Sequence, residues 1–178
     1  PEVSWTTQPD WVSSCYELDF AGYLNTYSHN TNLLRFLFET TPTVDFVNFT
    51  RMDGRIAVLN MGDFLCSLET GRSEYHYWDE IIQVYFKKGH LTIKTPPALL
   101  RNISARVELY RSTEKPETII YSGNWSWAFK RQAHAFVSDV LNETPSINAG
   151  VDALEDLKLC EQMWKMQIER NPEKSLNI

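Results

Sequence analysis

The spacing of apolar residues predicts an amphipathic helix near the start of the chain. Between residues 23 and 38 apolar side chains return every three or four positions, which is the period of a helix with one buried face. We expect that face to carry Tyr27, Leu34, Leu37 and Phe38. The helix ends before Pro42, because proline disfavours helical backbone in the residue that precedes it. The roughly twenty residues at the start are rich in turn formers and predict an irregular lead-in.

A series of shorter runs then alternates apolar with polar residues or is rich in β-branched and aromatic residues, as strands are. These runs are residues 44–50, 55–61, 64–68, 75–86, 91–95, 106–110 and 118–121. Short turns join several neighbours, as at residues 62–63 and 87–90, which indicates antiparallel hairpins. Because successive residues of a strand point to opposite faces, this pattern implies a sheet with one buried face and one open face.

Two amphipathic helices are predicted at the end of the chain. The apolar positions of the first are Phe129, Ala133, Phe136, Val137, Val140 and Leu141. Those of the last are Ala153, Leu154, Leu157, Cys160, Trp164 and Ile168. Carboxylates near the start of the last helix (Asp152, Glu155 and Asp156) and basic residues near its end (Lys165 and Arg170) suit the helix dipole.

These elements predict an α+β fold. We expect one domain over residues 1–178, with a largely antiparallel open sheet and helices packed on one of its faces. The other face is left free for oligomerisation. Because that face is rich in apolar side chains, we expect a homodimer or homotetramer built through it.

Composition excludes several classes of protein. The 17 basic and 23 acidic residues give a net charge of −6, which argues against nucleic acid as a partner. No run approaches the roughly 20 apolar residues that a membrane span needs, so we expect no membrane partner. The odd set of Cys15, Cys66 and Cys160 is a poor disulfide framework and fits the cytoplasm, where we expect the three to be small buried hydrophobes.

His29 is the candidate for chemistry. On the predicted helix it lies within roughly 60° of Asn25 and Asn32, on a polar stripe opposite the apolar one. Histidine is the side chain whose ordinary pKa suits proton transfer near neutral pH. Two interpretations stay open at this point: a general acid and base held by two amides, or an exposed or helix-capping histidine with asparagines that bond to the helix end.

Asn25, His29 and Asn32 are followed directly by Leu33-Leu34-Arg35-Phe36-Leu37-Phe38. This order resembles the C-terminal domain of the Gfo/Idh/MocA oxidoreductases, the relatives of glucose–fructose oxidoreductase and inositol dehydrogenase. That family has an Asp four residues before the His, an Asp three residues after it, and a similar Leu-Leu-Arg helix. Further segments in the family's order are residues 78–84, 88–91, 135–140 and 151–157.

The resemblance implies the substrate-binding half of a two-domain enzyme that moves hydride between a nicotinamide and a sugar, polyol or related molecule. NAD or NADP would be bound mainly by an N-terminal Rossmann domain, a partner that these residues do not contain, since no Gly-x-Gly-x-x-Gly occurs in them. His29 would exchange a proton with the substrate. Asn25 and Asn32 would contact the substrate or orient the imidazole. The family has Asp at both positions, so the amides leave open an altered chemistry or none.

Other motifs are weaker. The family's Glu-Lys-Pro signature occurs as Glu114-Lys115-Pro116, but after the His segment rather than before it, and we expect a chance tripeptide in an exposed turn. Trp125-Ser126-Trp127 is typical either of packing in a core or interface or of stacking on a sugar. No metal site is predicted. The alternative function is a non-catalytic ligand-binding or interaction module, with the sheet curved over the terminal helix.

Overall fold

The computed structural model describes residues 8–51, 54–71 and 77–173. The chain forms two compact units: unit 1 comprises Pro1–Glu74 and Asn148–Ile178, and unit 2 comprises Tyr75–Ile147. The described residues form three α-helices and two antiparallel open sheets, so the α+β class is confirmed. The strands pair into a sheet of three and a sheet of four, where the alternation alone predicted a single sheet.

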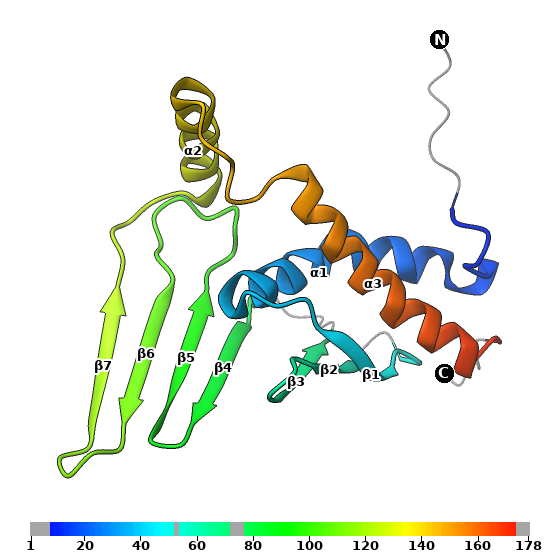
Figure 1. Ribbon diagram of the computed structural model, residues 1–178, viewed down its shortest axis with the longest axis horizontal. Helices are drawn as coiled ribbons and strands as arrows, with labels where there is room; N and C mark the ends of the chain where they lie inside the picture. Colours follow the sequence, from blue (N-terminus) through cyan, green and yellow to red (C-terminus); the bar gives the residue numbers. More distant parts are fainter. Residues whose placement is uncertain (1–7, 52–53, 72–76, 174–178) are drawn as a thin grey trace. The chain divides into compact units, whose positions relative to one another are not determined.

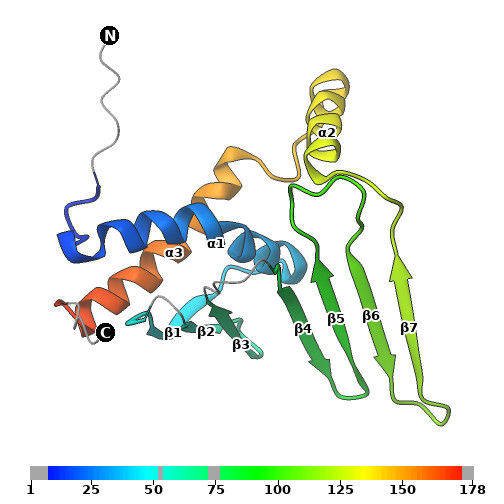
Figure 2. The ribbon, with the colours of Figure 1, turned by 180° about the vertical axis from the view of Figure 1, so that it is seen from behind.

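Two helices supply one layer of unit 1. Helix α1 (Glu17–Phe38) follows a short 3-10 turn, η1 (Ser14–Tyr16), and α3 (Gly150–Arg170) closes the described chain. Helix α1 begins earlier than the apolar pattern predicted, because its first turn carries acidic residues that suit the positive end of the helix dipole. Figures 1 and 2 show α1 and α3 side by side over the three-stranded sheet.

The sheet of unit 1 has the order β1 (Thr43–Asn48), β2 (Arg55–Asn60) and β3 (Leu65–Thr70), all antiparallel. The central strand β2 alternates strictly between buried and half-buried residues, as a strand covered on one face does. Ala57 and Leu59 are fully buried under the helices. The predicted packing of helices on one face therefore holds for this unit.

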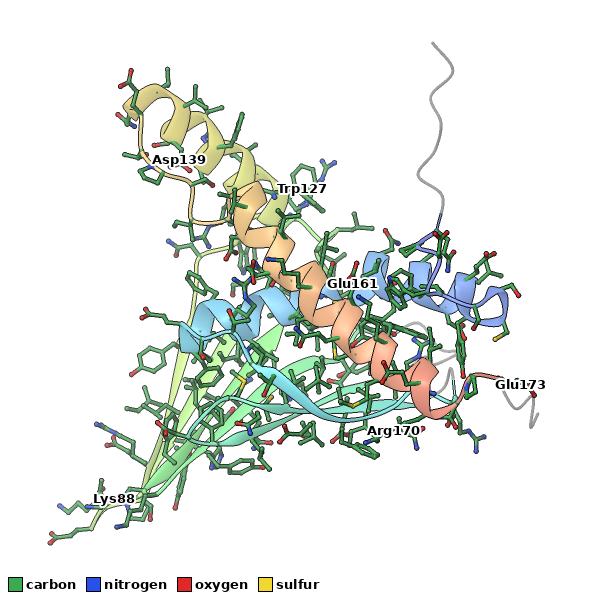
Figure 3. All side chains as sticks on the ribbon, turned by 45° about the vertical axis from the view of Figure 1, so that its right-hand side comes forward. Lys88, Trp127, Asp139, Glu161, Arg170 and Glu173 are labelled. Carbon is green, nitrogen blue, oxygen red and sulfur yellow. The ribbon has the colours of Figure 1, made fainter. Side chains whose placement is uncertain are left out.

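Aromatic rings dominate the core between these layers. Trp164 on α3 is fully buried and meets four rings edge to face, with centroids 5.2 to 6.0 Å away. The four rings are those of Tyr16, Phe20, Tyr23 and Phe49. Arg170 lies at the end of α3 (Figure 3). Its guanidinium lies over the ring of Phe46 on β1, 5.2 Å from the ring centroid.

Several sequence-based expectations about the core are wrong. Leu154 and Leu157, on the apolar stripe predicted for the last helix, are 52% and 42% exposed. Leu37, assigned to the buried face of the first helix, is 38% exposed, because it lies at the margin of that face. Cys15 is exposed at the 3-10 turn and Cys66 is half-buried, so only Cys160 is the small buried hydrophobe that was expected of all three. Tyr27, Leu34 and Phe38 belong to the core as predicted.

Unit 2 contains a four-stranded meander and one helix. Its strands follow the chain order β4 (Glu80–Phe86), β5 (Gly89–Thr95), β6 (Arg106–Arg111) and β7 (Glu117–Ser122), and α2 (Ala128–Asn142) comes next. Strand β4 starts at Glu80 rather than at residue 75; residues 77–79 are not in a strand, and 75–76 lie outside the described residues.

A two-residue turn closes the hairpin between β4 and β5, with Lys88 at its tip (Figure 3). Glycine is needed directly after this turn. A Cβ at Gly89 would collide with the backbone carbonyl oxygen of Tyr110 on β6, so only a residue without a side chain permits the two strands to pair there.

The register of the four strands gathers apolar side chains on one face of the unit 2 sheet. That face carries Ile82, Val84, Phe86, Leu91, Ile93, Val107, Leu109, Ile119 and Tyr121. The opposite face is mainly polar. No described residue of unit 2 is buried, and the apolar stripe predicted for α2 is also exposed, with Phe136 at 66% and Leu141 at 77%. This unit therefore has apolar surface without a core.

The three cysteines are expected to react with thiol reagents in the order of their exposure. None is in a disulfide. Burial raises the pKa of the Cys160 thiol to about 11 and also raises that of Cys66, which suppresses the reactive thiolate. At about pH 8 a maleimide should label Cys15 quickly, Cys66 more slowly, and Cys160 only after denaturation, as peptide mapping would show. Rapid labelling of Cys160 in the folded chain would contradict this burial.

No helix in the described part of the chain combines the length and the apolar character needed to cross a lipid bilayer.

Candidate functional site

His29 lies on the exposed face of α1, in unit 1. Its side chain is exposed, and so is that of Asn25 one turn earlier, while Tyr23 and Leu34 on the opposite face are buried in the core. The helix therefore turns the predicted polar stripe away from the core, because the apolar residues fix its rotation. The imidazole is exposed rather than packed in hydrocarbon.

The same face of α1 carries apolar residues on both sides of His29. Leu18 and Phe36 lie seven residues before Asn25 and seven after His29, and they are 89% and 59% exposed. Two large exposed apolar side chains on one helix face, with a histidine and an amide between them, form a surface suited to contact with another molecule or domain.

Asn32 does not share this exposure. It is half-buried, and its amide nitrogen donates to Asp156 Oδ2 at 2.8 Å and Asp152 Oδ2 at 3.2 Å, with Asn148 Oδ1 at 3.4 Å. The structure thus brings Asn25 and His29 together and turns Asn32 toward the first turns of α3.

Arg35 completes this network between α1 and α3. Its Nη1 donates to Asp156 Oδ1 at 2.7 Å and to the Asp152 carbonyl at 3.1 Å, and its Nη2 donates to Asp152 Oδ1 at 2.6 Å. Burial alone would lower the pKa of the guanidinium, but the hydrogen bonds to the two carboxylates outweigh it and raise that pKa. The arginine is therefore charged throughout the physiological range.

Sequence reasoning missed this network. Arg35 was part of the family resemblance without a role, and Asp152 and Asp156 were assigned only to the helix dipole. Their spacing of four residues, which places two carboxylates on one face of a helix, is a signal that could have pointed to a basic partner. The partner itself lies 117 to 121 residues away in sequence, so no local pattern identifies it.

The weaker motifs fall in unit 2. Glu114-Lys115-Pro116 lies in the exposed turn between β6 and β7, as expected. Trp125 is 80% exposed, so it does not pack in a core of the described chain. Trp127 is half-buried; its indole nitrogen donates to the Ala98 carbonyl at 3.1 Å, and the Arg101 guanidinium lies over its ring.

The described residues do not fit a dinucleotide cradle. All of their strand pairs are antiparallel, whereas the nucleotide-binding crossover joins parallel strands through a glycine-rich turn. Within the same residues no group of three or more His, Cys, Asp or Glu side chains could hold a metal ion. Of the three candidate residues predicted from the sequence, the structure exposes a histidine and an amide, His29 and Asn25, on one face of α1.

No protein-family model and no curated protein sequence matches the chain. Several solved structures share its fold. They include the putative oxidoreductase yvaA from Bacillus subtilis (TM-score 0.60, 11% identity, 83% of this chain), the probable oxidoreductase yhhX (0.57, 14%, 81%) and a putative oxidoreductase from Klebsiella pneumoniae (0.60, 14%, 83%). The alignment covers 50%, 48% and 48% of their chains, so this chain spans about half their length.

Proposed function

We propose that this chain is the substrate-binding domain of a cytoplasmic NAD(P)-dependent oxidoreductase that acts on a sugar, polyol or related small molecule. The observation that carries the proposal is the exposed His29 beside Asn25, on a helix face bordered by exposed apolar residues. The likeness of the fold to half of three proteins named as oxidoreductases supports it.

In this proposal His29 moves the proton at the substrate oxygen. Its imidazole accepts the hydroxyl proton when the alcohol is oxidised and returns it when the carbonyl is reduced. Asn25 orients the imidazole or contacts a neighbouring hydroxyl, and Asn32 contributes its amide oxygen. A bound nicotinamide would accept the hydride when the alcohol is oxidised. Because the described residues offer no dinucleotide cradle, we assign its binding mainly to an N-terminal Rossmann domain of the same protein, the proposed partner of the α1 face.

The experiment that tests this division compares the 178-residue chain with a protein that joins it to a Rossmann domain. Nicotinamide fluorescence should show no NADH binding by the chain alone. The two-domain protein should bind NADH and reduce NAD or NADP with at least one member of a panel of polyols and aldoses. Micromolar binding of NADH to the chain alone would refute the division of roles, and inactivity of the two-domain protein on the whole panel would refute the proposed reaction.

A second candidate is a non-catalytic ligand-binding or interaction module. The amides at positions 25 and 32 favour it, because an amide orients an imidazole without the charge that a carboxylate supplies. Such a module would hold its ligand between the sheet and the terminal helix. A cleft of about 560 Å³ in unit 1 lies instead at the strand ends, lined by residues such as Asn48, Arg55 and Thr70 and by none from α3.

The apolar face of the unit 2 sheet supports a proposed homodimer or homotetramer. Two such faces would bury one another and remove surface that a monomer leaves in water. Light scattering at tens of micromolar should give a dimer or tetramer. Leu109→Lys, at the centre of the apolar face, should shift it toward monomer, whereas Thr92→Lys on the polar face should not. A monomeric wild-type chain, or equal effects of the two lysines, would contradict this assembly.

A further inference from the structure

The network around Asn32 has a defined direction of hydrogen bonding. The carboxylates of Asp152 and Asp156 can only accept, and both hold the Asn32 amide nitrogen within 3.2 Å. Asp156 is only 7% exposed at its side chain and Asp152 is 39% exposed. A donor at position 32 therefore satisfies an oxygen of Asp156 that water reaches poorly, and it also bonds to the more exposed Asp152.

With a neutral residue at position 32 the network carries a net charge of −1, and a third carboxylate would make it −2. Two carboxylates face one guanidinium, and both terminal nitrogens of Arg35 are already engaged with them. A carboxylate at position 32 would stand about 3 Å from two others, replace two donated hydrogen bonds by repulsion, and leave three negative groups with one cation.

We infer that Asn32 is a positioning residue: it is an amide because α3 presents Asp152 and Asp156 to it, and it fixes the polar face of α1 against the start of α3. The amide at this position, where the family has Asp, is then accounted for by these contacts with α3. Within the described residues Asn32 Oδ1 has no partner, so only an acceptor remains for a ligand.

A preference for one kind of substrate group follows from these contacts, and it rests on the proposed function. If a substrate binds beside His29, Asn32 can accept a hydrogen bond from it but has no donor to offer, which favours a hydroxyl group over a carbonyl at that position. The anchoring role itself does not depend on any activity.

The test exchanges the amide at position 32 with the carboxylate at position 156. The midpoint of thermal unfolding of the 178-residue chain is followed by circular dichroism. At neutral pH Asn32→Asp should lower the unfolding midpoint by about 5–10 °C. The double variant Asn32→Asp/Asp156→Asn, which reverses donor and acceptor, should recover most of that loss. Asn25→Asp, on the same helix but exposed and distant from these carboxylates, is the matched control and should leave the midpoint within about 2 °C.

A pH series separates repulsion from simple loss of packing. The charged and titratable groups that face position 32 are Arg35 and His29 on α1 and Asp152 and Asp156 on α3. At about pH 3, below the ordinary pKa of aspartic acid, the deficit of Asn32→Asp relative to the wild type should shrink. Three results would overturn the inference. The midpoint of Asn32→Asp could be unchanged at neutral pH, or its deficit relative to the wild type could be the same at all pH values. The double variant could also fail to fold or fail to regain the lost midpoint. Since no readout is enzymatic, failure here is distinct from failure of the proposed function.

Discussion

Replacing Trp164 with alanine is expected to lower the free energy of unfolding of unit 1 by about 3–5 kcal/mol. The indole is fully buried and packs against rings from the 3-10 turn, α1 and the segment after β1, so its removal opens a cavity where three parts of the chain meet. The Arg55 guanidinium also lies 5.8 Å from the centroid of this ring and would lose that contact.

Such a loss is a large share of the 5–15 kcal/mol or so that stabilises a typical domain. Chemical denaturation followed by circular dichroism would measure it, and labelling of the buried Cys160 would report on unit 1 in particular. Trp125→Ala is the matched control, because that ring is 80% exposed, and it should change stability by less than about 0.5 kcal/mol. Equal effects of the two substitutions would mean that Trp164 does not organise this core.

Local structure followed from the sequence because periodicity records which face of each element is buried. The alternation in β2 and the apolar stripe of α1 each determine which side of the element faces the core. In α1 this orientation about the helix axis places Asn25 and His29 on the outer side. The early start of α1 escaped prediction because Leu18 and Gly22 interrupt the apolar pattern; both face outward. Tyr77 and Trp78 resembled a strand through their propensity alone, and the structure places neither of them in a strand.

Long-range partners could not be predicted in the same way. A period of two shows that a strand has two different faces, but not which hairpins share a sheet, and so one sheet was expected where the structure has two. Asn32 was grouped with His29 by helical geometry, yet its contacts are set by Asp152 and Asp156, 120 and 124 residues later. Only the packing of α3 on α1 distinguishes Asn32, whose amide bonds to α3, from the exposed Asn25.

Replacing His29 with alanine in the two-domain protein, which joins this chain to a Rossmann domain, is expected to lower kcat by about 10²- to 10⁴-fold. That is the usual contribution of a general acid and base. KM should change much less, because the imidazole acts mainly on the proton that moves in the transition state. His134→Ala is the matched control: this histidine is also exposed but lies on α2, in unit 2. Steady-state kinetics with the preferred polyol or sugar would check both variants.

The pH dependence of kcat/KM in the wild-type protein and in His29→Gln tests the central claim most directly, since it asks whether this imidazole carries the substrate proton. The account predicts a limb between about pH 5 and 8 in the wild type, where histidine side chains titrate, and its absence from the variant. The same limb in both proteins, with kcat reduced less than about threefold in the variant, would assign the proton to another group.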